Sequence, residues 1–414
     1  MTKRLFWRLA PLAFLWALNA APCFSQSKDI ITAVKITGLK RTKPRTAEEP
    51  LRRFIGEDAS SLDTDKVKAA VIDQGILEPL SVSLDEAPGE QGKILAVDVK
   101  EKWSLFVGPF FFAGTGSISA GLFFFDANAF GLSHRMIAGG MYQNGGWLAL
   151  LIYIAPPGGA GRLGWFAAAS FSDWEQRNAG ADNNTLRLYN ARTANAEFSP
   201  QYQITNALNA AFNLAYKNIM ILDTGDTVLK PDTGTQFIQL GPEITLRKTG
   251  WDGYLLSEES VSVKYNLIQD IASPSWHSLS FKGIYEKPLL PGFRLNVHGG
   301  GIFRPDVPAL LEEGPGGTGT SILPVSFSAR HYAGISLGLE KYLYRFSFGT
   351  ASLFGAWQMA YSNGPILGSR FDYGAALSLR FYLSRLAIPA FGAGVTYNIP
   401  ARYFQFAFSI GMTI

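Results

Sequence analysis

The sequence is short of cysteine, of charge and of long hydrophobic runs. Its 414 residues include one cysteine, Cys23, and 17% charged residues, whereas soluble globular chains have about 25%. Cys23 lies in an N-terminal leader, so the rest of the chain has neither a disulfide framework nor a thiol nucleophile. Beyond the leader, no stretch reaches the roughly 18 apolar residues of a membrane-spanning helix. These absences exclude a disulfide scaffold, a thiol enzyme and a helical membrane protein.

The net charge gives no sign of a nucleic-acid partner. The formal value of +4 depends on Lys3, Arg4 and Arg8, and without these three residues it falls to +1. Nucleic-acid-binding domains need a strongly basic face. The four histidines show no metal-ligand spacing. We therefore predict no nucleic acid, no metal and no cofactor.

Residues 1–25 have the pattern of a secretory signal peptide. Three basic residues precede an apolar stretch at 9–21, and small residues lead to Gln26, which predicts cleavage near Ser25. The alternative is an N-terminal membrane anchor, but the apolar run is short and Pro11 interrupts it.

The rest of the chain divides at Lys102 into two regions of different composition. Residues 28–102 hold 27 charged residues among 75 and one aromatic, Phe54. Residues 103–414 hold 40 charged residues among 312, with 49 of the 55 aromatics and 38 of the 43 glycines. We predict a domain boundary at this change.

The first region has the pattern of a small α+β domain. Predicted strands and helices follow in the order β-α-α-β-β, at 30–37, 45–55, 63–74, 80–84 and 94–99. Asp63 is the expected N-cap of the second helix. With VKITGLKRT at 34–42 and GIL at 75–77, this order resembles a POTRA domain. The resemblance implies a periplasmic module whose open strand edge meets client polypeptides; the alternative is a small α+β domain of another role.

The second region alternates between apolar and small or polar residues, as β-strands do. In the last stretch, apolar side chains at even positions from Phe404 to Ile414 alternate with polar or small ones from Tyr403 to Thr413. A soluble sandwich also alternates, but it rarely combines so few charges with a signal peptide. A closed transmembrane β-barrel satisfies both, because closure pairs every backbone group and the outer face meets lipid.

About sixteen strands are predicted in this barrel. Their expected starts are residues 103, 117, 134, 146, 162, 184, 205, 234, 258, 276, 291, 334, 347, 370, 386 and 402. The eleventh and twelfth are joined by a connection at 304–333 that is rich in glycine and proline. Connections of this length are usually functional or disordered.

Together these features resemble the BamA/TamA outer-membrane assembly superfamily, the bacterial surface antigen family. The likeness rests on the POTRA-like module, EKWSL at 101–105, FFF at 110–112 and GLFFFDAN at 121–128. It implies a protein of the bacterial outer membrane that inserts β-barrels or moves polypeptides without nucleotide hydrolysis. It also implies that the long loop folds back into the lumen and carries a Val-Arg-Gly-Phe/Tyr signature.

The matching place in this sequence reads Ala-Arg-His-Tyr at 329–332. Arg330 and Tyr332 match the signature and are the predicted lid-loop residues, whereas His331 replaces the glycine. Strand alternation places Glu340 and Asp372 on the lumen face, where either could pair with Arg330. The alternative is an exposed arginine on an external loop.

Two further positions depart from the family pattern. Ser362 stands where the thirteenth strand of the family has an acidic residue, and the chain ends in Ile414 rather than phenylalanine. Both departures suggest a divergent member with a specialised client.

No enzyme constellation is present. The G-x-S-x-G match at 334–338 falls within a predicted strand, whereas a hydrolase elbow turns into a helix. The glycine patterns at 159–164 and 314–319 do not open a helix after a strand. We therefore predict no catalytic or cofactor-binding residues.

Three functions are weighed. The favoured one is insertion of outer-membrane proteins or translocation of polypeptides, with the outer-membrane bilayer, extended clients and accessory periplasmic proteins as partners. The alternative is a passive pore or structural barrel without a protein client. A membrane-embedded lipase or protease would need a catalytic dyad that the sequence lacks.

Overall fold

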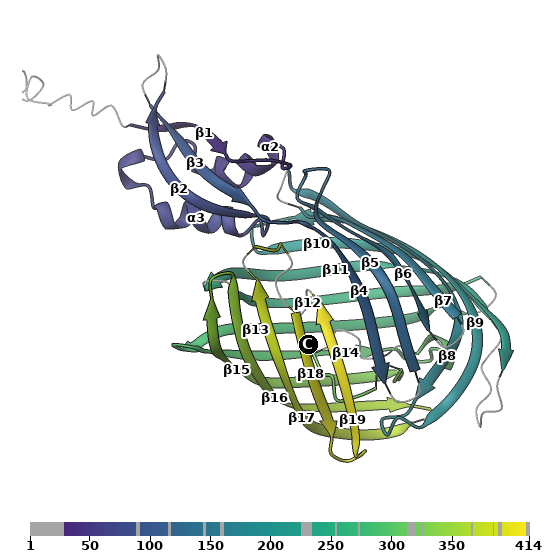
Figure 1. Cartoon of the computed structure of the whole chain (residues 1–414). Helices are drawn as coiled ribbons and strands as arrows, with labels where there is room; N and C mark the ends of the chain where they lie inside the picture. Colours follow the sequence, from purple (N-terminus) through teal and green to yellow (C-terminus); the bar gives the residue numbers. More distant parts are fainter. Residues whose placement is uncertain are drawn as a thin grey trace, which may run out of the picture.

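A computed structural model describes the chain in two sheets, one of three strands and one of sixteen (Figure 1). The described residues are 29–87, 92–114, 117–143, 146–157, 161–224, 234–252, 255–271, 274–312, 314, 319–324, 326–365, 367–383, 385–387 and 391–410. The predicted signal peptide lies outside them.

The N-terminal domain has the predicted β-α-α-β-β order. Its elements are β1 (Ile31–Thr37), α2 (Pro44–Glu48), the 3-10 helices Glu49–Phe54 and Ala59–Ser61, α3 (Thr64–Ile72), β2 (Leu77–Glu86) and β3 (Lys93–Glu101). Strand β3 is central, parallel to β1 and antiparallel to β2. The first predicted helix is split in two near Pro50, because proline has no N–H for the helical hydrogen bond.

The second helix begins as predicted. The Asp63 side chain accepts hydrogen bonds from the backbone N–H groups of Asp65 and Lys66 at 3.0 and 3.3 Å, which caps α3. The helix ends before Gly75, which has a φ of +75°. Its buried face joins one apolar core with residues of the other elements, namely Leu51, Phe54, Val67, Val71, Leu95 and Val97.

The C-terminal region is an antiparallel barrel of sixteen strands, in the number predicted. The strands are β4 (Leu105–Gly114), β5 (Ser117–Ala129), β6 (His134–Gln143), β7 (Gly146–Ala155), β8 (Leu163–Ala179), β9 (Thr185–Gln203), β10 (Leu208–Thr224), β11 (Thr235–Asp252), β12 (Leu255–Asp270), β13 (Trp276–Leu290), β14 (Phe293–Phe303), β15 (His331–Phe346), β16 (Gly349–Gly364), β17 (Gly368–Leu383), β18 (Phe391–Asn398) and β19 (Tyr403–Ile410). Each predicted start lies within five residues of the observed one.

Alternation gives the barrel two different faces. On β15 to β17, outward residues are large and apolar, and inward residues are buried and polar. The outward set includes Leu337, Leu339, Leu353, Trp357, Leu377 and Leu379, and the inward set includes Ser336, Glu340, Ser352, Gln358, Ser378 and Arg380. The outer face therefore suits hydrocarbon. Within the described ranges, no helix is long and apolar enough to cross a membrane.

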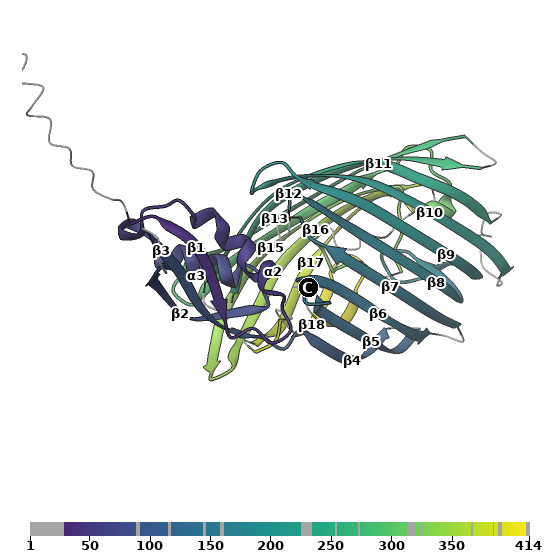
Figure 2. The same cartoon turned by 90° about the horizontal axis from the view of Figure 1, so that it is seen from above.

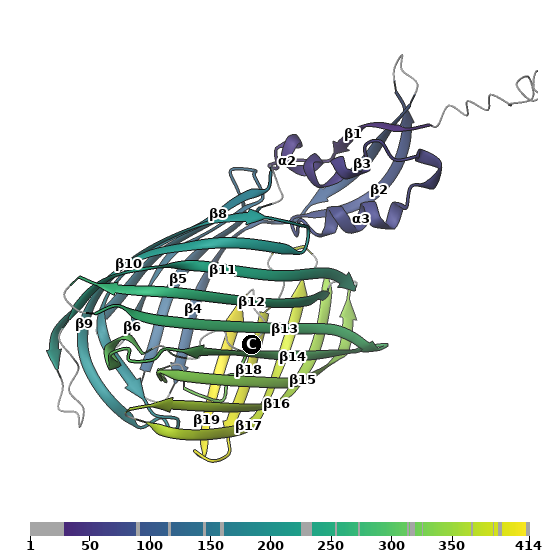
Figure 3. The same ribbon diagram turned by 180° about the vertical axis from the view of Figure 1, so that it is seen from behind.

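The sheet curves round until its two outermost strands, β4 and β19, come into contact (Figures 1 and 2). The hydrogen-bonded order of the described strands runs from β19 to β4 without a β19–β4 pair. We call this line of contact the seam. The strands beside it are short, with 10 residues in β4 and 8 each in β18 and β19, whereas β8 to β13 have 15 to 19 (Figure 3).

The N-terminal domain lies at one end of the barrel, where β4 begins (Figure 1). Because successive strands alternate in direction, the connection at 304–330 between β14 and β15 lies at the opposite end. The barrel therefore has a domain end and a loop end.

Candidate functional site

The described part of the loop at 304–330 lies inside the barrel and touches its inner wall on several sides. The Asn178 amide of β8 donates to the Ser328 hydroxyl at 3.2 Å. The backbone N–H of Ser321 donates to the Gln358 side chain of β16 at 2.7 Å, and the Thr396 hydroxyl of β18 donates to the Ser321 carbonyl at 2.8 Å. These strands lie far apart around the sheet, so the loop spans the lumen. The expectation of an inward-folded loop is met.

Two apolar clusters anchor the loop to the wall. Val307, Leu310 and Leu311 pack against a patch on β9 to β13, whose members include Tyr189, Ile219, Phe237, Ile268 and Trp276. Ile322, Leu323, Phe327 and Ala329 pack against Tyr332 and Ala360. Burying one large apolar side chain stabilises by about 1.5–3 kcal/mol. The loop is therefore held as a lid.

Arg304 fixes the start of this lid. Its guanidinium is buried and donates to the Ser278 hydroxyl of β13 at 3.0 Å and to the Leu311 carbonyl at 2.9 Å. One arginine thus ties the first turn of the loop to the wall.

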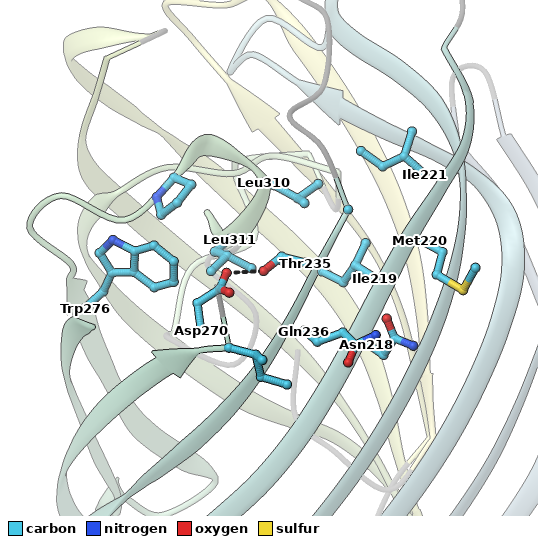
Figure 4. A pocket seen from close by; sticks show the side chains of 13 residues that line it. Asn218, Ile219, Met220, Ile221, Thr235, Gln236, Asp270, Trp276, Leu310 and Leu311 are labelled. Atoms are coloured by element: carbon cyan, nitrogen blue, oxygen red, sulfur yellow. Dashed lines mark hydrogen bonds between the residues drawn. The ribbon is translucent and has the colours of Figure 1, made fainter. Parts of the chain in front are cut away.

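A cavity of about 650 Å³ lies between the lid and strands β10 to β13 (Figure 4). Apolar Leu310 and Leu311 of the lid and Ile219, Ile221 and Trp276 of the wall line it together with polar Asn218, Gln236 and Asp270. The Asp270 carboxylate accepts a hydrogen bond from the Thr235 hydroxyl at its edge (Figure 4). The lid is therefore incompletely packed against this wall.

The structure divides the predicted signature between the loop and a strand. Arg330 ends the loop, but His331 and Tyr332 already pair with Phe303 and Ile302 as the first residues of β15. The His331 ring stacks on Phe303, with the centroids 4.5 Å apart. Tyr332 is buried and its hydroxyl contacts Thr320 of the lid. The signature therefore lies at the junction of the loop and β15, whereas the sequence predicts all four of its residues within the connection at 304–333.

Arg330 has a different partner from the two predicted for it. Its Nε lies 3.9 Å from Glu312 Oε1, within the loop, and the side chain is 27% exposed. Glu340 and Asp372 are buried on the lumen face as expected, but neither pairs with Arg330 among the described side chains. Glu340 is too deep, since it lies nine residues along β15, about 30 Å from the loop end. Asp372 is bound by Arg370 at 3.0 Å and by Asn398 at 3.1 Å.

Glu340 instead belongs to a buried ionic cluster that sequence reasoning missed. Its Oε2 lies 2.8 Å from Arg294 and 3.3 Å from Arg380, and its Oε1 accepts from the Tyr382 hydroxyl at 2.7 Å. Arg294 also lies 3.3 Å from Glu286. Two arginines and two glutamates thus balance in charge across β13, β14, β15 and β17.

Strand β16, which lies between β15 and β17, completes this ionic cluster. The Ser352 hydroxyl donates to Glu340, and the Arg380 guanidinium lies 3.7 Å from the centroid of the Phe354 ring. Buried charges persist only when they are paired and hydrogen-bonded. A one-residue slip of any strand would turn its member outward, so the cluster fixes the register of five consecutive strands.

The lid reaches this cluster through Gly319. That residue has a φ of +91°, and a Cβ there would lie 2.9 Å from His298 Cβ on β14. His298 Nε2 in turn lies 2.7 Å from Glu286 Oε1. Glycine is required at this close approach. The middle of the loop therefore rests on the edge of the ionic cluster.

No metal centre is formed by the described residues, since none of their His, Cys, Asp and Glu side chains gather in groups of three or more. The Gly334–Gly338 motif lies within β15.

Comparisons with known proteins agree on the fold. Neither a protein-family model nor a curated protein sequence matches the chain. CdiB from Escherichia coli has a TM-score of 0.61 at 12% identity, covering 93% of this chain and 75% of that one. CdiB from Acinetobacter baumannii has a TM-score of 0.60 at 12% identity, covering 93% and 74%. BamA from Haemophilus ducreyi lacking POTRA domains 1–3 has 0.53 at 12% identity, covering 92% and 83%. The chain shares the fold of these barrels, as the sequence predicted.

Proposed function

We propose that the chain is a bacterial outer-membrane barrel that inserts outer-membrane proteins or moves polypeptides across that membrane. The observation that carries this proposal is the lid: the described residues of the segment 304–330 lie in the lumen and are anchored to β8, β13, β16 and β18. The fold shared with BamA and CdiB supports it. So does the resemblance of the sequence to the BamA/TamA superfamily, with Arg330 and Tyr332 at the base of the lid.

The N-terminal domain is the proposed entry point for an extended client, as a POTRA-like module in the periplasm. Strand β2 pairs only with β3 among the described strands, so one of its edges is open. Leu80 on β2 is 59% exposed. An extended polypeptide would add to this edge by main-chain hydrogen bonds, with apolar side chains against Leu80. The free energy would come from folding of the client.

The rival function is a passive pore or a structural barrel without a client. His331 in place of glycine and Ser362 in place of an acidic residue favour it, as departures from the family pattern. A pore needs an open lumen, however, and two apolar clusters and buried Arg304 hold the lid across this one. The anchored lid therefore favours the client-handling function.

The deciding experiment is depletion of the protein, followed by a quantitative inventory of outer-membrane and secreted proteins. We expect one or a few proteins to be lost and then restored by the wild-type chain. Leu80→Lys should fail to restore them, because a charge on the edge opposes strand addition. Ala69→Lys adds the same charge on the exposed side of α3 and should restore them. An unchanged inventory with altered uptake of small solutes would support the pore instead.

We also infer that residues 1–25 are removed as a signal peptide and that 28–102 fold independently of 103–414. A fragment of residues 28–102 should be soluble and folded without detergent, because 27 of its 75 residues are charged and the described part has its own apolar core. A disordered fragment would overturn this division.

A further inference from the structure

The segment that joins the two domains also pairs with the far end of the barrel sheet. Trp103 lies two residues before β4. Its backbone N–H donates to the Arg385 carbonyl at 2.9 Å, and its carbonyl accepts from the Ala387 N–H at 3.1 Å. Residues 385–387 connect β17 to β18. The segment before the first barrel strand is thus hydrogen-bonded to the connection that leads into the fifteenth.

These two hydrogen bonds cross the seam at the domain end of the barrel. The sheet order has β4 at one end and β18 next to last at the other. Among the described residues, the backbone hydrogen bonds that join the two ends of the sheet are the two made by Trp103. One ring contact accompanies them, between Phe106 of β4 and Phe391 of β18 with centroids 6.1 Å apart. Trp103 as a whole is 69% exposed, and both of its hydrogen bonds to residues 385 and 387 are made by its backbone.

The N-terminal domain holds both sides of this link. On one side, Arg41 lies 2.9 Å from Asp126 of β5, and the Lys43 N–H donates to the Gly131 carbonyl at 2.9 Å. On the other side, Ala387 packs against the apolar core of the domain. A Cβ on Gly131 would lie 2.3 Å from the Arg41 carbonyl oxygen, so this docking needs glycine. The domain therefore bridges the two ends of the sheet.

We propose that the Trp103 linker is a clasp that holds the domain end of the seam together, and that displacement of the N-terminal domain releases it. The clasp stands on these contacts alone, whereas its use for admitting a client rests on the proposed function. Two hydrogen bonds are few beside the eight residue pairs that join β18 to β19. The seam is consequently the place where the barrel opens with the fewest bonds broken.

The test measures the seam directly in the full chain. The one cysteine, Cys23, lies in the segment that we infer to be removed, so the remaining chain is a cysteine-free background. Spin labels are placed at Val107→Cys on β4 and Phe406→Cys on β19, two outward and exposed positions. Distances are measured by pulsed electron resonance in lipid nanodiscs. Ala387→Pro removes the N–H that donates to Trp103. We expect it to raise the long-distance population about two- to tenfold, the effect of one hydrogen bond.

Leu386→Pro is the matched control, because the Leu386 N–H donates to no described partner. It should leave the distances as in the background chain. Gly131→Ala, which disturbs domain docking without touching the linker, should raise the long-distance population and carries the test if Ala387→Pro does not fold. Equal distances in Ala387→Pro and Leu386→Pro, or no change in Gly131→Ala, would overturn the clasp. Neither result depends on a client, so failure here is separate from failure of the proposed function.

Discussion

The wall formed by β13 to β17 and the seam between β4 and β19 are built from the same alternating pattern but are held together differently. Across the wall, registers of 11, 11, 15 and 16 residue pairs join neighbouring strands, and Glu340 lies between two buried arginines. At the seam, the described strands touch without a hydrogen-bonded register. Closure of the sheet is therefore uneven, and the seam is its weak line.

The lid is held mainly by strands away from the seam. It contacts Ser278, His298 and Gln358 on β13, β14 and β16. It also accepts a hydrogen bond from Thr396 of β18, but none of these contacts crosses between β4 and β19. The seam could thus open while the lid and the wall stay together. A barrel that passes clients sideways between β4 and β19 would need a seam that opens separately from the wall. A pore that stays closed all round would not.

The largest expected effect is that of Glu340→Gln. It leaves Arg294 and Arg380 buried beside a neutral group, and removing one partner of a buried ion pair costs about 3–5 kcal/mol of unfolding free energy. The temperature at which the protein unfolds in detergent, read from its gel migration, should fall clearly. Asp173→Asn is the control, because its partner Arg192 is 45% exposed; it should cost at most about 1 kcal/mol. Equal losses of unfolding free energy in Glu340→Gln and Asp173→Asn would show that the buried ionic cluster of the wall is no more stabilising than an exposed ion pair.

Phe106→Ala should have a smaller effect at the seam. A fully buried phenylalanine costs about 3–5 kcal/mol when truncated, and because Phe106 is only partly buried we expect about 1–2 kcal/mol. The unfolding temperature should fall less than in Glu340→Gln. Val107→Ala, on the outward face of the same strand, should be close to neutral. A loss in Phe106→Ala as large as that in Glu340→Gln would break the comparison.

Arg330→Ala should act on the lid with little effect on the barrel. Its ion pair with Glu312 is long and partly exposed, so we expect at most about 1 kcal/mol. Fluctuations of single-channel conductance should rise while the barrel still assembles. Unchanged conductance, together with fast labelling of Arg330→Cys, would leave the lid without a role for this residue.

Acid should weaken the docking of the N-terminal domain on the barrel. Partial burial alone would raise the pKa of Glu101, but hydrogen bonds from the Thr42 hydroxyl and from the backbone of Arg41 and Thr42 bring it below its usual 4.5. A lowered pKa contributes stability above pH 4.5 that is lost as the pH falls through the folded value. Labels on the domain and on β5 should therefore separate below about pH 4.5, and Glu101→Gln should lose this pH dependence.

The sequence predicts which face of the barrel a side chain is on better than it predicts the position of that side chain along the barrel axis. A period of two residues fixes which side chains point inward, and Glu340 and Asp372 do. The depth of each residue depends on strand tilt and stagger, which no single strand reveals. The sequence therefore offers Glu340 and Asp372 as partners of Arg330, although Glu340 lies nine residues along β15 from its start at the loop. The ionic cluster was missed for the same reason, since Arg294, Glu340 and Arg380 meet only once three registers are known.

The measurement that tests this uneven closure most directly is hydrogen–deuterium exchange of the full chain in nanodiscs, followed peptide by peptide. We predict that β4, β18 and β19 exchange well before β13 to β17, and that Ala387→Pro accelerates the first group alone. Uniform exchange around the barrel, or faster exchange in β13 to β17 than beside the seam, would contradict the account.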